Sequence, residues 1–181
     1  VLLLHGMSDS PYSLRALAER FHQQGYYVIG LRLPGHGTLP AALRDIHWLD
    51  MSAAVELAME HLVSMAGPES VHIVGYSTGA SLAINHAIDQ FEAGLPVPSS
   101  LVLISPAIRV HPLSALAGVK NLFSSLPGLD NLAYLSVMDE FDPYKYNSCA
   151  SNAAAQVHGI TKHVVRRLES LSGNPAVAEF P

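Results

Sequence analysis

A serine between two glycines is the first residue of this chain whose surroundings favour covalent chemistry. Ser77 lies in the stretch VHIVGYSTGAS, residues 71–81, with Gly75 two positions before it and Gly79 two positions after it. A sharp turn from a strand into a helix crowds the positions on either side, so residues without side chains are favoured there. A serine in such a turn projects its hydroxyl above the sheet, where it can act as a nucleophile. The pattern alone is a weak signal, and the surrounding elements must decide its meaning.

Segments with the hydrophobic pattern of strands alternate along the chain with segments that have the pattern of helices. Short apolar runs predict strands at residues 1–4, 26–33, 71–74 and 101–105. Apolar residues recur at helical spacing over residues 11–24, 48–66 and 78–91, with Ser10 as the predicted N-cap of the first helix. Strands that are apolar on both faces and joined through helices predict an α/β fold, with a mostly parallel sheet covered by helices on both faces. Ser77 then falls between a strand and a helix.

The pattern changes after Pro106. Residues 107–170 contain several short helical segments, broken at Pro112, Pro127 and Pro143, and no strand is predicted among them. We therefore expect a core at residues 1–106, an α-helical cap inserted at residues 107–170, and a lead-in to a further core strand at residues 171–181. Because the chain opens directly on a strand and stops before the next one, we expect it to be part of a longer protein.

A second loop supports a nucleophilic role for Ser77. Acyl transfer needs two N–H donors directed at the oxygen that becomes negatively charged. The amide of the residue after the nucleophile, Thr78, is one candidate. The loop of His5, Gly6 and Met7 directly follows the first predicted strand, and the Met7 N–H is the second candidate.

Three motifs together resemble one known family. The stretches LLLHG, LRLPGHG and VGYSTGA, in this order and spacing, are similar to the α/β-hydrolase superfamily, most closely to its monoacylglycerol lipase, lysophospholipase and serine aminopeptidase-like branch. The resemblance covers about residues 1–107 and implies a partial α/β-hydrolase fold. It implies Ser77 as nucleophile and the Met7 and Thr78 amides as oxyanion hole. The residues that it implies shape the elbow and the loop are His5, Gly6, Gly75, Tyr76 and Gly79.

The sequence leaves the general base open. A serine hydroxyl needs a histidine to take its proton and an acid to orient that histidine, and in this family both follow later strands. We therefore expect the acid and the base outside this chain. The alternative within the chain combines Asp139 or Asp142 with His158 or His163. Three other histidines are predicted to have structural roles: His5 and His36 shape loops, and His86 packs in the core.

The amino-acid composition limits the kinds of partner and cofactor that we expect for this protein. The net charge is −5 without a dense basic run, which disfavours nucleic acid. The basic group of Lys162, Arg166 and Arg167 is predicted to be the solvated face of a helix. Cys149 is the single cysteine, so neither a disulfide nor a cysteine zinc site is predicted. No cofactor, metal or transmembrane segment is predicted, the oligomeric state stays open, and the cytoplasm is favoured without excluding a signal peptide.

The predicted activity is hydrolysis of a carboxylic ester through an acyl-enzyme, with a small apolar ester as substrate. Alternatives on the same scaffold are an acyltransferase, a serine aminopeptidase or a haloperoxidase, because a scaffold does not fix a reaction. A non-catalytic binding module is the alternative outside the enzymes. A dinucleotide loop in PGHGTLP is disfavoured, because Pro40 replaces the third glycine. Four aromatic residues of the cap could line an acyl pocket or form the cap's own core: Tyr134, Phe141, Tyr144 and Tyr146.

Overall fold

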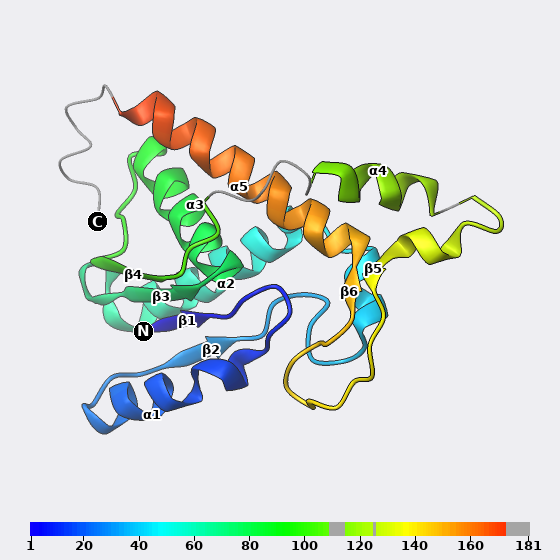
Figure 1. Ribbon diagram of the computed structural model, residues 1–181. Helices are drawn as coiled ribbons and strands as arrows, with labels where there is room; N and C mark the ends of the chain where they lie inside the picture. The colour runs from blue at the N-terminus through cyan, green and yellow to red at the C-terminus, as the bar shows by residue number, and fades with distance from the viewer. Residues whose placement is uncertain (109–114, 125, 173–181) are drawn as a thin grey trace.

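A four-stranded parallel sheet forms the centre of the protein in the computed structural model, which describes residues 1–108, 115–124 and 126–172. The strands lie in the order β2-β1-β3-β4 and all run in the same direction (Figure 1). Their bounds are β1 (Leu2–Leu4), β2 (Ile29–Leu31), β3 (His72–Tyr76) and β4 (Ser100–Ile104). The predicted parallel α/β sheet is therefore confirmed.

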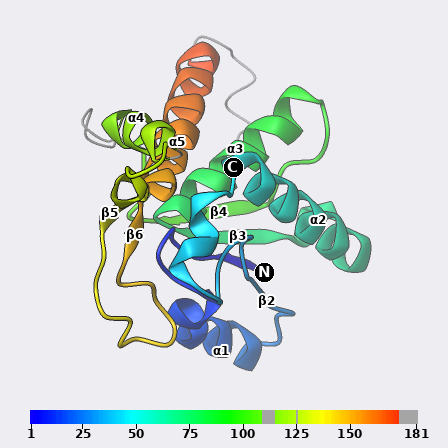
Figure 2. The ribbon, with the colours of Figure 1, turned by 90° about the vertical axis from the view of Figure 1, so that its right-hand side faces the viewer.

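Helices cover both faces of this sheet, as predicted. α1 (Arg15–Gln23), preceded by the 3₁₀ turn η1 (Pro11–Leu14), lies on one face, whereas α2 (Trp48–Ala66) and α3 (Thr78–Glu92) lie on the other (Figure 2). The alternation of side chains along β1 explains both layers. Leu2 and Leu4 are fully buried in the cluster formed with α2 and α3. Val1 and Leu3 are buried in the cluster on the α1 face.

Two local predictions in the core need correction. The second strand extends only over Ile29–Leu31 and not over residues 26–33, because its neighbour β1 offers only three pairing residues. Ser10 occupies the predicted N-cap position, but its hydroxyl makes no capping hydrogen bond. That hydroxyl is buried and has no partner among the described residues. Two further 3₁₀ turns, η2 (Pro40–Arg44) and η3 (Pro68–Ser70), lie in the connections beside α2.

The described residues 115–124 and 126–172 form what we call the cap region. It contains α4 (Ala115–Phe123), the turn η5 (Asp130–Ala133) and the long helix α5 (Ser151–Leu171). It also contains two short antiparallel strands, β5 (Tyr134–Ser136) and β6 (Cys149–Ala150).

The predicted helical segments are present in this region, with interruptions around Pro127 and Pro143, but the prediction that it contains no strand was wrong. The strands have three and two residues, too few to show an alternating pattern in the sequence. α5 is continuous over 21 residues, because no proline interrupts it. The proposed break at Pro112 and most of the segment 171–181 lie outside the described residues.

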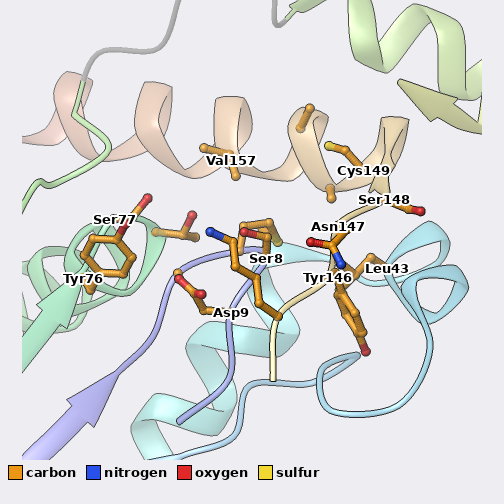
Figure 3. Close-up of a pocket in the computed structure, with 16 residues that line it drawn as sticks. Ser8, Asp9, Leu43, Tyr76, Ser77, Tyr146, Asn147, Ser148, Cys149 and Val157 are labelled. Atoms are coloured by element: carbon orange, nitrogen blue, oxygen red, sulfur yellow. The ribbon is translucent and has the colours of Figure 1, made fainter. Parts of the chain in front are cut away.

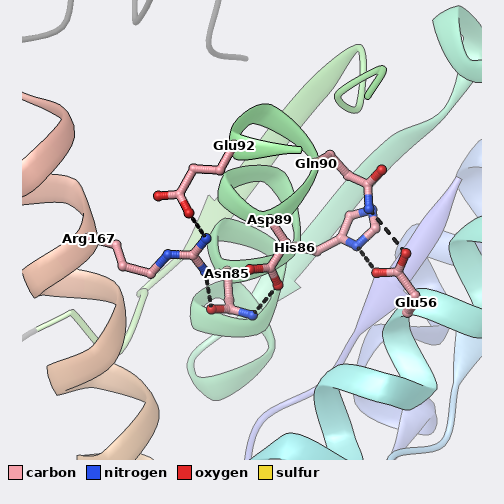
Figure 4. A network of polar contacts seen from close by, with 7 residues as sticks. All are labelled: Glu56, Asn85, His86, Asp89, Gln90, Glu92 and Arg167. Carbon is pink, nitrogen blue, oxygen red and sulfur yellow. Dashed lines mark hydrogen bonds and ion pairs between the residues drawn. The ribbon is translucent and has the colours of Figure 1, made fainter. Parts of the chain in front are cut away.

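α3 is joined to its two neighbouring helices by polar side chains (Figure 4). On one side, Arg167 of α5 donates to the Asn85 amide oxygen at 3.2 Å and to the Glu92 carboxylate at 2.7 Å, and it also pairs with Asp89. The prediction of a solvated basic face was therefore wrong for Arg167, whose side chain is only 17% exposed. Arg166 beside it is exposed.

On the other side of α3, His86 Nδ1 lies 3.1 Å from a carboxylate oxygen of Glu56 in α2. His86 is buried, as predicted, and this contact provides its polar partner. Burial lowers the pKa of His86, and the nearby Glu56 carboxylate opposes that shift. Among the described helices, none is both long enough and apolar enough to cross a lipid bilayer.

Candidate active site

Ser77 occupies the turn between β3 and α3 in a strained conformation. Its φ of 53° and ψ of −114° lie outside the regions that residues with a Cβ normally adopt. The surrounding backbone holds it there: the Ser77 N–H donates to the Ile104 carbonyl at 3.0 Å. The Ser77 carbonyl accepts from the N–H groups of Ala80 at 3.1 Å and Ala107 at 3.2 Å. The hydroxyl caps no backbone group of α3, so it is available to a ligand.

The two glycines beside Ser77 have no space for a side chain. A Cβ on Gly75 would lie 2.5 Å from the Cα of Ala80. A Cβ on Gly79 would lie 2.3 Å from the Leu4 carbonyl oxygen and 2.7 Å from that of His5. Both distances are far shorter than van der Waals contact and involve backbone, which cannot move aside cheaply. The close approach of α3 to the end of β1 therefore depends on glycine.

The loop after β1 directs the Met7 N–H. The Leu33 N–H donates to His5 Nε2 at 3.2 Å, so His5 must carry its proton on Nδ1, which lies 2.8 Å from the Gly6 carbonyl oxygen. The Asp9 N–H donates to the same oxygen at 3.1 Å. Because a trans peptide is planar, the Met7 N–H must point opposite to this fixed carbonyl.

His5 stays neutral in this position. It is fully buried, and burial lowers its pKa to about 4. The hydrogen bond to the Gly6 carbonyl opposes that shift and the nearby His36 adds to it. His36 lies 4.8 Å from His5, ring centroid to ring centroid. The two rings thus fill the space beneath the loop that carries Met7.

Ser77, Met7 and Thr78 all line one cavity of about 530 Å³ (Figure 3). Thr78 is the first residue of α3, where no carbonyl within the helix can accept its N–H. Within the described part of the chain, no backbone carbonyl accepts the Met7 N–H either. Residues of the core line one side of this cavity, and residues of the cap region line the other side. The cap side is lined by Lys145, Tyr146, Asn147, Ser148, Cys149, Ala153, Ala154 and Val157.

The cavity is apolar on the side of α5 and polar near the loop after β1. Burial raises the pKa of Asp9, with Lys145 opposing that shift and Asp142 adding to it. Burial also raises the pKa of the Cys149 thiol, so the thiol stays protonated at neutral pH. The cavity can therefore hold an apolar group against Ala153, Ala154 and Val157 and a polar group near Ser8 and Asp9.

Comparison with known proteins agrees with this geometry. The model of the alpha/beta hydrolase family matches residues 1–177. The chain belongs to the α/β-hydrolase family. Among curated proteins, this chain is 32% identical over 108 residues to the thermostable monoacylglycerol lipase of Bacillus sp. (strain H-257), covering 60% of this chain and 42% of that protein.

A second curated relative is the dihydrolipoyllysine-residue acetyltransferase component of the acetoin cleaving system of Cupriavidus necator. It is 31% identical over 110 residues, which cover 59% of this chain and 26% of that protein. The chain thus spans less than half the length of both curated relatives.

Solved structures show the same fold. One comes from work on LipS and LipT, two metagenome-derived lipolytic enzymes, with a TM-score of 0.73, 28% identity, and coverage of 92% of this chain and 65% of that chain. The monoacylglycerol lipase of Paleococcus ferrophilus gives a TM-score of 0.62 at 16% identity, covering 93% and 67%. The curated lipase and the lipolytic structure confirm the predicted resemblance to the monoacylglycerol lipase branch, and the Paleococcus ferrophilus structure shows the same fold.

The structure does not bring the predicted alternative base, His158 or His163, to Ser77. No histidine is among the described residues that line the cavity. His163 packs on Trp48 instead, with ring centroids 4.9 Å apart. His158 does not line the cavity, and neither do Asp139 and Asp142. Among the described residues there is also no cluster of histidine, cysteine and acidic side chains that could hold a metal ion.

Several cavity residues were missed by sequence reasoning. Ser8 and Asp9 directly follow the predicted oxyanion loop, which was the signal for placing them near Ser77. Lys145 and Asn147 carried no such signal, because the cap region brings them to the site from far along the chain. Of the four aromatic residues predicted as pocket or cap core, only Tyr146 lines the cavity. Phe141 is 77% exposed, and Tyr144 stacks on Tyr12.

Proposed function

We propose that this α/β-hydrolase cleaves carboxylic esters through an acyl-enzyme formed on Ser77. The observation that carries the proposal is the conformation of Ser77. Ser77 has a positive φ and is held by four backbone hydrogen bonds at the edge of a cavity that Met7 and Thr78 also line. Backbone strain of this kind is costly and is typical of functional sites.

In the proposed reaction the Ser77 oxygen attacks the ester carbonyl, and the N–H groups of Met7 and Thr78 stabilise the tetrahedral oxyanion. Collapse of that intermediate expels the alcohol and leaves the acyl group on Ser77, and water then releases the acid. The apolar wall formed by Ala153, Ala154 and Val157 favours a substrate with an apolar acyl or alkyl group, such as a lipid ester.

A histidine must take the Ser77 proton and return it to the leaving alcohol. Because no described residue of the cavity is a histidine, we propose that this base and its acid come from a segment of the protein outside residues 1–181. The acyltransferase and aminopeptidase alternatives use the same nucleophile. They differ in the acceptor of the acyl group and in the bond that is cleaved, so product analysis with ester, thioester and amide substrates separates them.

A fluorophosphonate probe tests the proposal in the full-length protein that contains this chain. Such a probe reacts with an activated serine, and peptide mapping should place the label on Ser77. Ser77→Ala should lose both labelling and ester hydrolysis, with a fall in kcat of about 10⁴-fold or more. The exposed Ser13→Ala serves as the matched control and should keep both. Labelling at another serine, or full hydrolysis by Ser77→Ala, contradicts the proposal.

A further inference from the structure

The segment between β5 and β6, residues 137–148, forms a strap that crosses from the cap region to the loops of the core. In Figure 1 it is the yellow segment that descends toward the start of α1. Its own shape is fixed by Glu140, whose carboxylate accepts the N–H groups of Asn147 at 2.8 Å and Ser148 at 2.7 Å. These bonds lower the pKa of Glu140. The strap is therefore an ordered element.

Tyr146 of the strap contacts two core loops with three hydrogen bonds. Its backbone N–H donates to the Ser8 carbonyl at 2.7 Å. Its hydroxyl donates to the Gly35 carbonyl at 3.1 Å and accepts the Thr38 N–H at 3.0 Å. The half-buried ring at the same time lines the cavity that contains Ser77 (Figure 3). Among the described residues of the strap, Tyr146 alone has hydrogen bonds to both of these loops, so the connection depends on Tyr146.

The loop held by the Tyr146 hydroxyl carries His36, which in turn contacts the oxyanion loop. The rings of Tyr146 and His36 are stacked, with 6.1 Å between centroids and 19° between planes. His36 Nε2 lies 2.7 Å from the Met7 carbonyl oxygen, and Nδ1 lies 2.9 Å from that of Pro34. A neutral imidazole carries one N–H, and with that proton on Nε2 the His36 ring donates to the Met7 carbonyl. The Ser8 carbonyl accepts directly from the Tyr146 N–H. Both carbonyls follow the N–H group that we assign to the oxyanion hole.

We propose that Tyr146 is a positioning residue of the oxyanion hole, which links the strap to the Met7 N–H through His36 and the Ser8 carbonyl. The inference rests on the proposed function, because it assigns Tyr146 to the step in which the oxyanion forms. An oxyanion donor is effective only in a narrow range of distance and direction, and loss of a whole donor costs about 10²- to 10³-fold in kcat. A loop that has lost part of its support keeps the donor but holds it less well.

The test compares Tyr146→Phe with Tyr144→Phe in the full-length protein. Both variants lose one hydroxyl from the same strap, but the Tyr144 hydroxyl has no hydrogen bond to a described residue and its ring packs on Tyr12. Tyr146→Phe should lower kcat for a p-nitrophenyl ester by about 10-fold with KM little changed. It should weaken inhibition by a trifluoromethyl ketone, which forms a tetrahedral adduct, by a similar factor. Tyr144→Phe should match the wild type in all three quantities.

Hydrogen exchange measures the same loop without using activity. In Tyr146→Phe the peptide that covers residues 5–10 should exchange faster than in the wild type, whereas in Tyr144→Phe it should not. Unchanged exchange in this peptide overturns the proposal, and so does a loss of thermal stability with unchanged kcat and unchanged inhibition. If the wild type takes up a fluorophosphonate at Ser77 while Tyr146→Phe behaves as the wild type, only this inference fails. If the wild type takes up none, the proposed function fails first.

Discussion

The cavity wall formed by the core and the wall formed by the cap region differ in what holds them in place. On the core side, Ser77 and the loop after β1 rest on fully buried residues such as Leu4 and His5, and backbone atoms approach within the space of a missing Cβ at Gly79. On the cap side, α5 packs Ile160 and Val164 into the main core cluster and adds separate polar contacts along its length. The strap reaches the core loops through the hydrogen bonds of Tyr146. Dense packing leaves little freedom, whereas single polar contacts can be removed one at a time.

The polar contacts of the cap side are spread along α5. Near its start, Asn152 Nδ2 donates to the Leu43 carbonyl at 3.0 Å and to the Ile46 carbonyl at 2.8 Å. In the middle, the Thr161 hydroxyl donates to the Ala107 carbonyl at 2.7 Å. Near its end lies Arg167 with its partners on α3. We therefore expect substitutions at the closely packed core side of the cavity to lower the free energy of unfolding most. Removal of a single polar contact on the cap side should have a smaller and more local effect.

The largest expected change in stability comes from a comparison of Gly79 in the core with Gly118 in the cap region. Gly79→Ala places a methyl group against the Leu4 and His5 carbonyls, and we expect it to lower the free energy of unfolding by about 3 kcal/mol or more. Gly118→Ala in α4 meets only Ala155 Cβ at 3.8 Å, an ordinary contact. Since alanine is favoured over glycine within a helix, this variant should gain up to about 1 kcal/mol. Urea denaturation measures both, and equal effects at the two positions would remove the distinction between the walls.

The second prediction concerns the pH dependence of stability that the buried His5 causes. The pKa of His5 is about 4 when folded and near its ordinary value of 6.5 when unfolded, so between these pH values the unfolded state binds more protons. Stability must therefore fall as the pH drops from 6.5 toward 4, by about 3 kcal/mol over this interval from His5 alone.

Urea denaturation of His5→Asn at pH 7 and at pH 5 isolates this contribution. The variant should be less stable than the wild type at pH 7, because the contacts with Leu33 and Gly6 change, but its stability should depend less on pH. His22→Asn on the exposed surface of α1 is the control and should keep the wild-type dependence. A His5→Asn protein with the full wild-type dependence would show that another group causes it.

The smallest expected effect concerns the junction between the two walls. Arg167→Met removes the hydrogen bonds from α5 to Asn85, Asp89 and Glu92 while keeping an unbranched, flexible stem in place of the first part of the side chain. Because the two carboxylates are about half exposed, water compensates part of the loss, and we expect a decrease of about 1–2 kcal/mol in stability. The exposed Arg166→Met should stay within about 0.5 kcal/mol of the wild type. Thermal unfolding of both variants gives the answer, and a larger loss for Arg166→Met would contradict the assignment.

The core could be predicted from the sequence to a larger extent than the cap region. The strands, the three core helices and the glycines around Ser77 leave local patterns, because burial on a regular element repeats with the period of that element. The parallel sheet followed from these patterns, and the placement of Met7 at the same site as Ser77 followed from the family resemblance, whereas the strand order was not predicted. The strands β5 and β6 left no pattern, because a two- or three-residue strand is defined by its partner and not by its own sequence.

The sequence by itself determined the turn of Ser77, the parallel sheet beneath it and the family, since each depends on residues that are close in the chain or on a repeating period. Only the tertiary structure decided that Tyr146 holds the Ser8 carbonyl, that Lys145 and Asn147 border the cavity, and that Arg167 is paired with α3. The physical reason is the origin of these contacts. The hydrogen bonds of Tyr146 and Arg167 join residues 75 or more positions apart, and such a contact has no period and no local motif that a sequence could display.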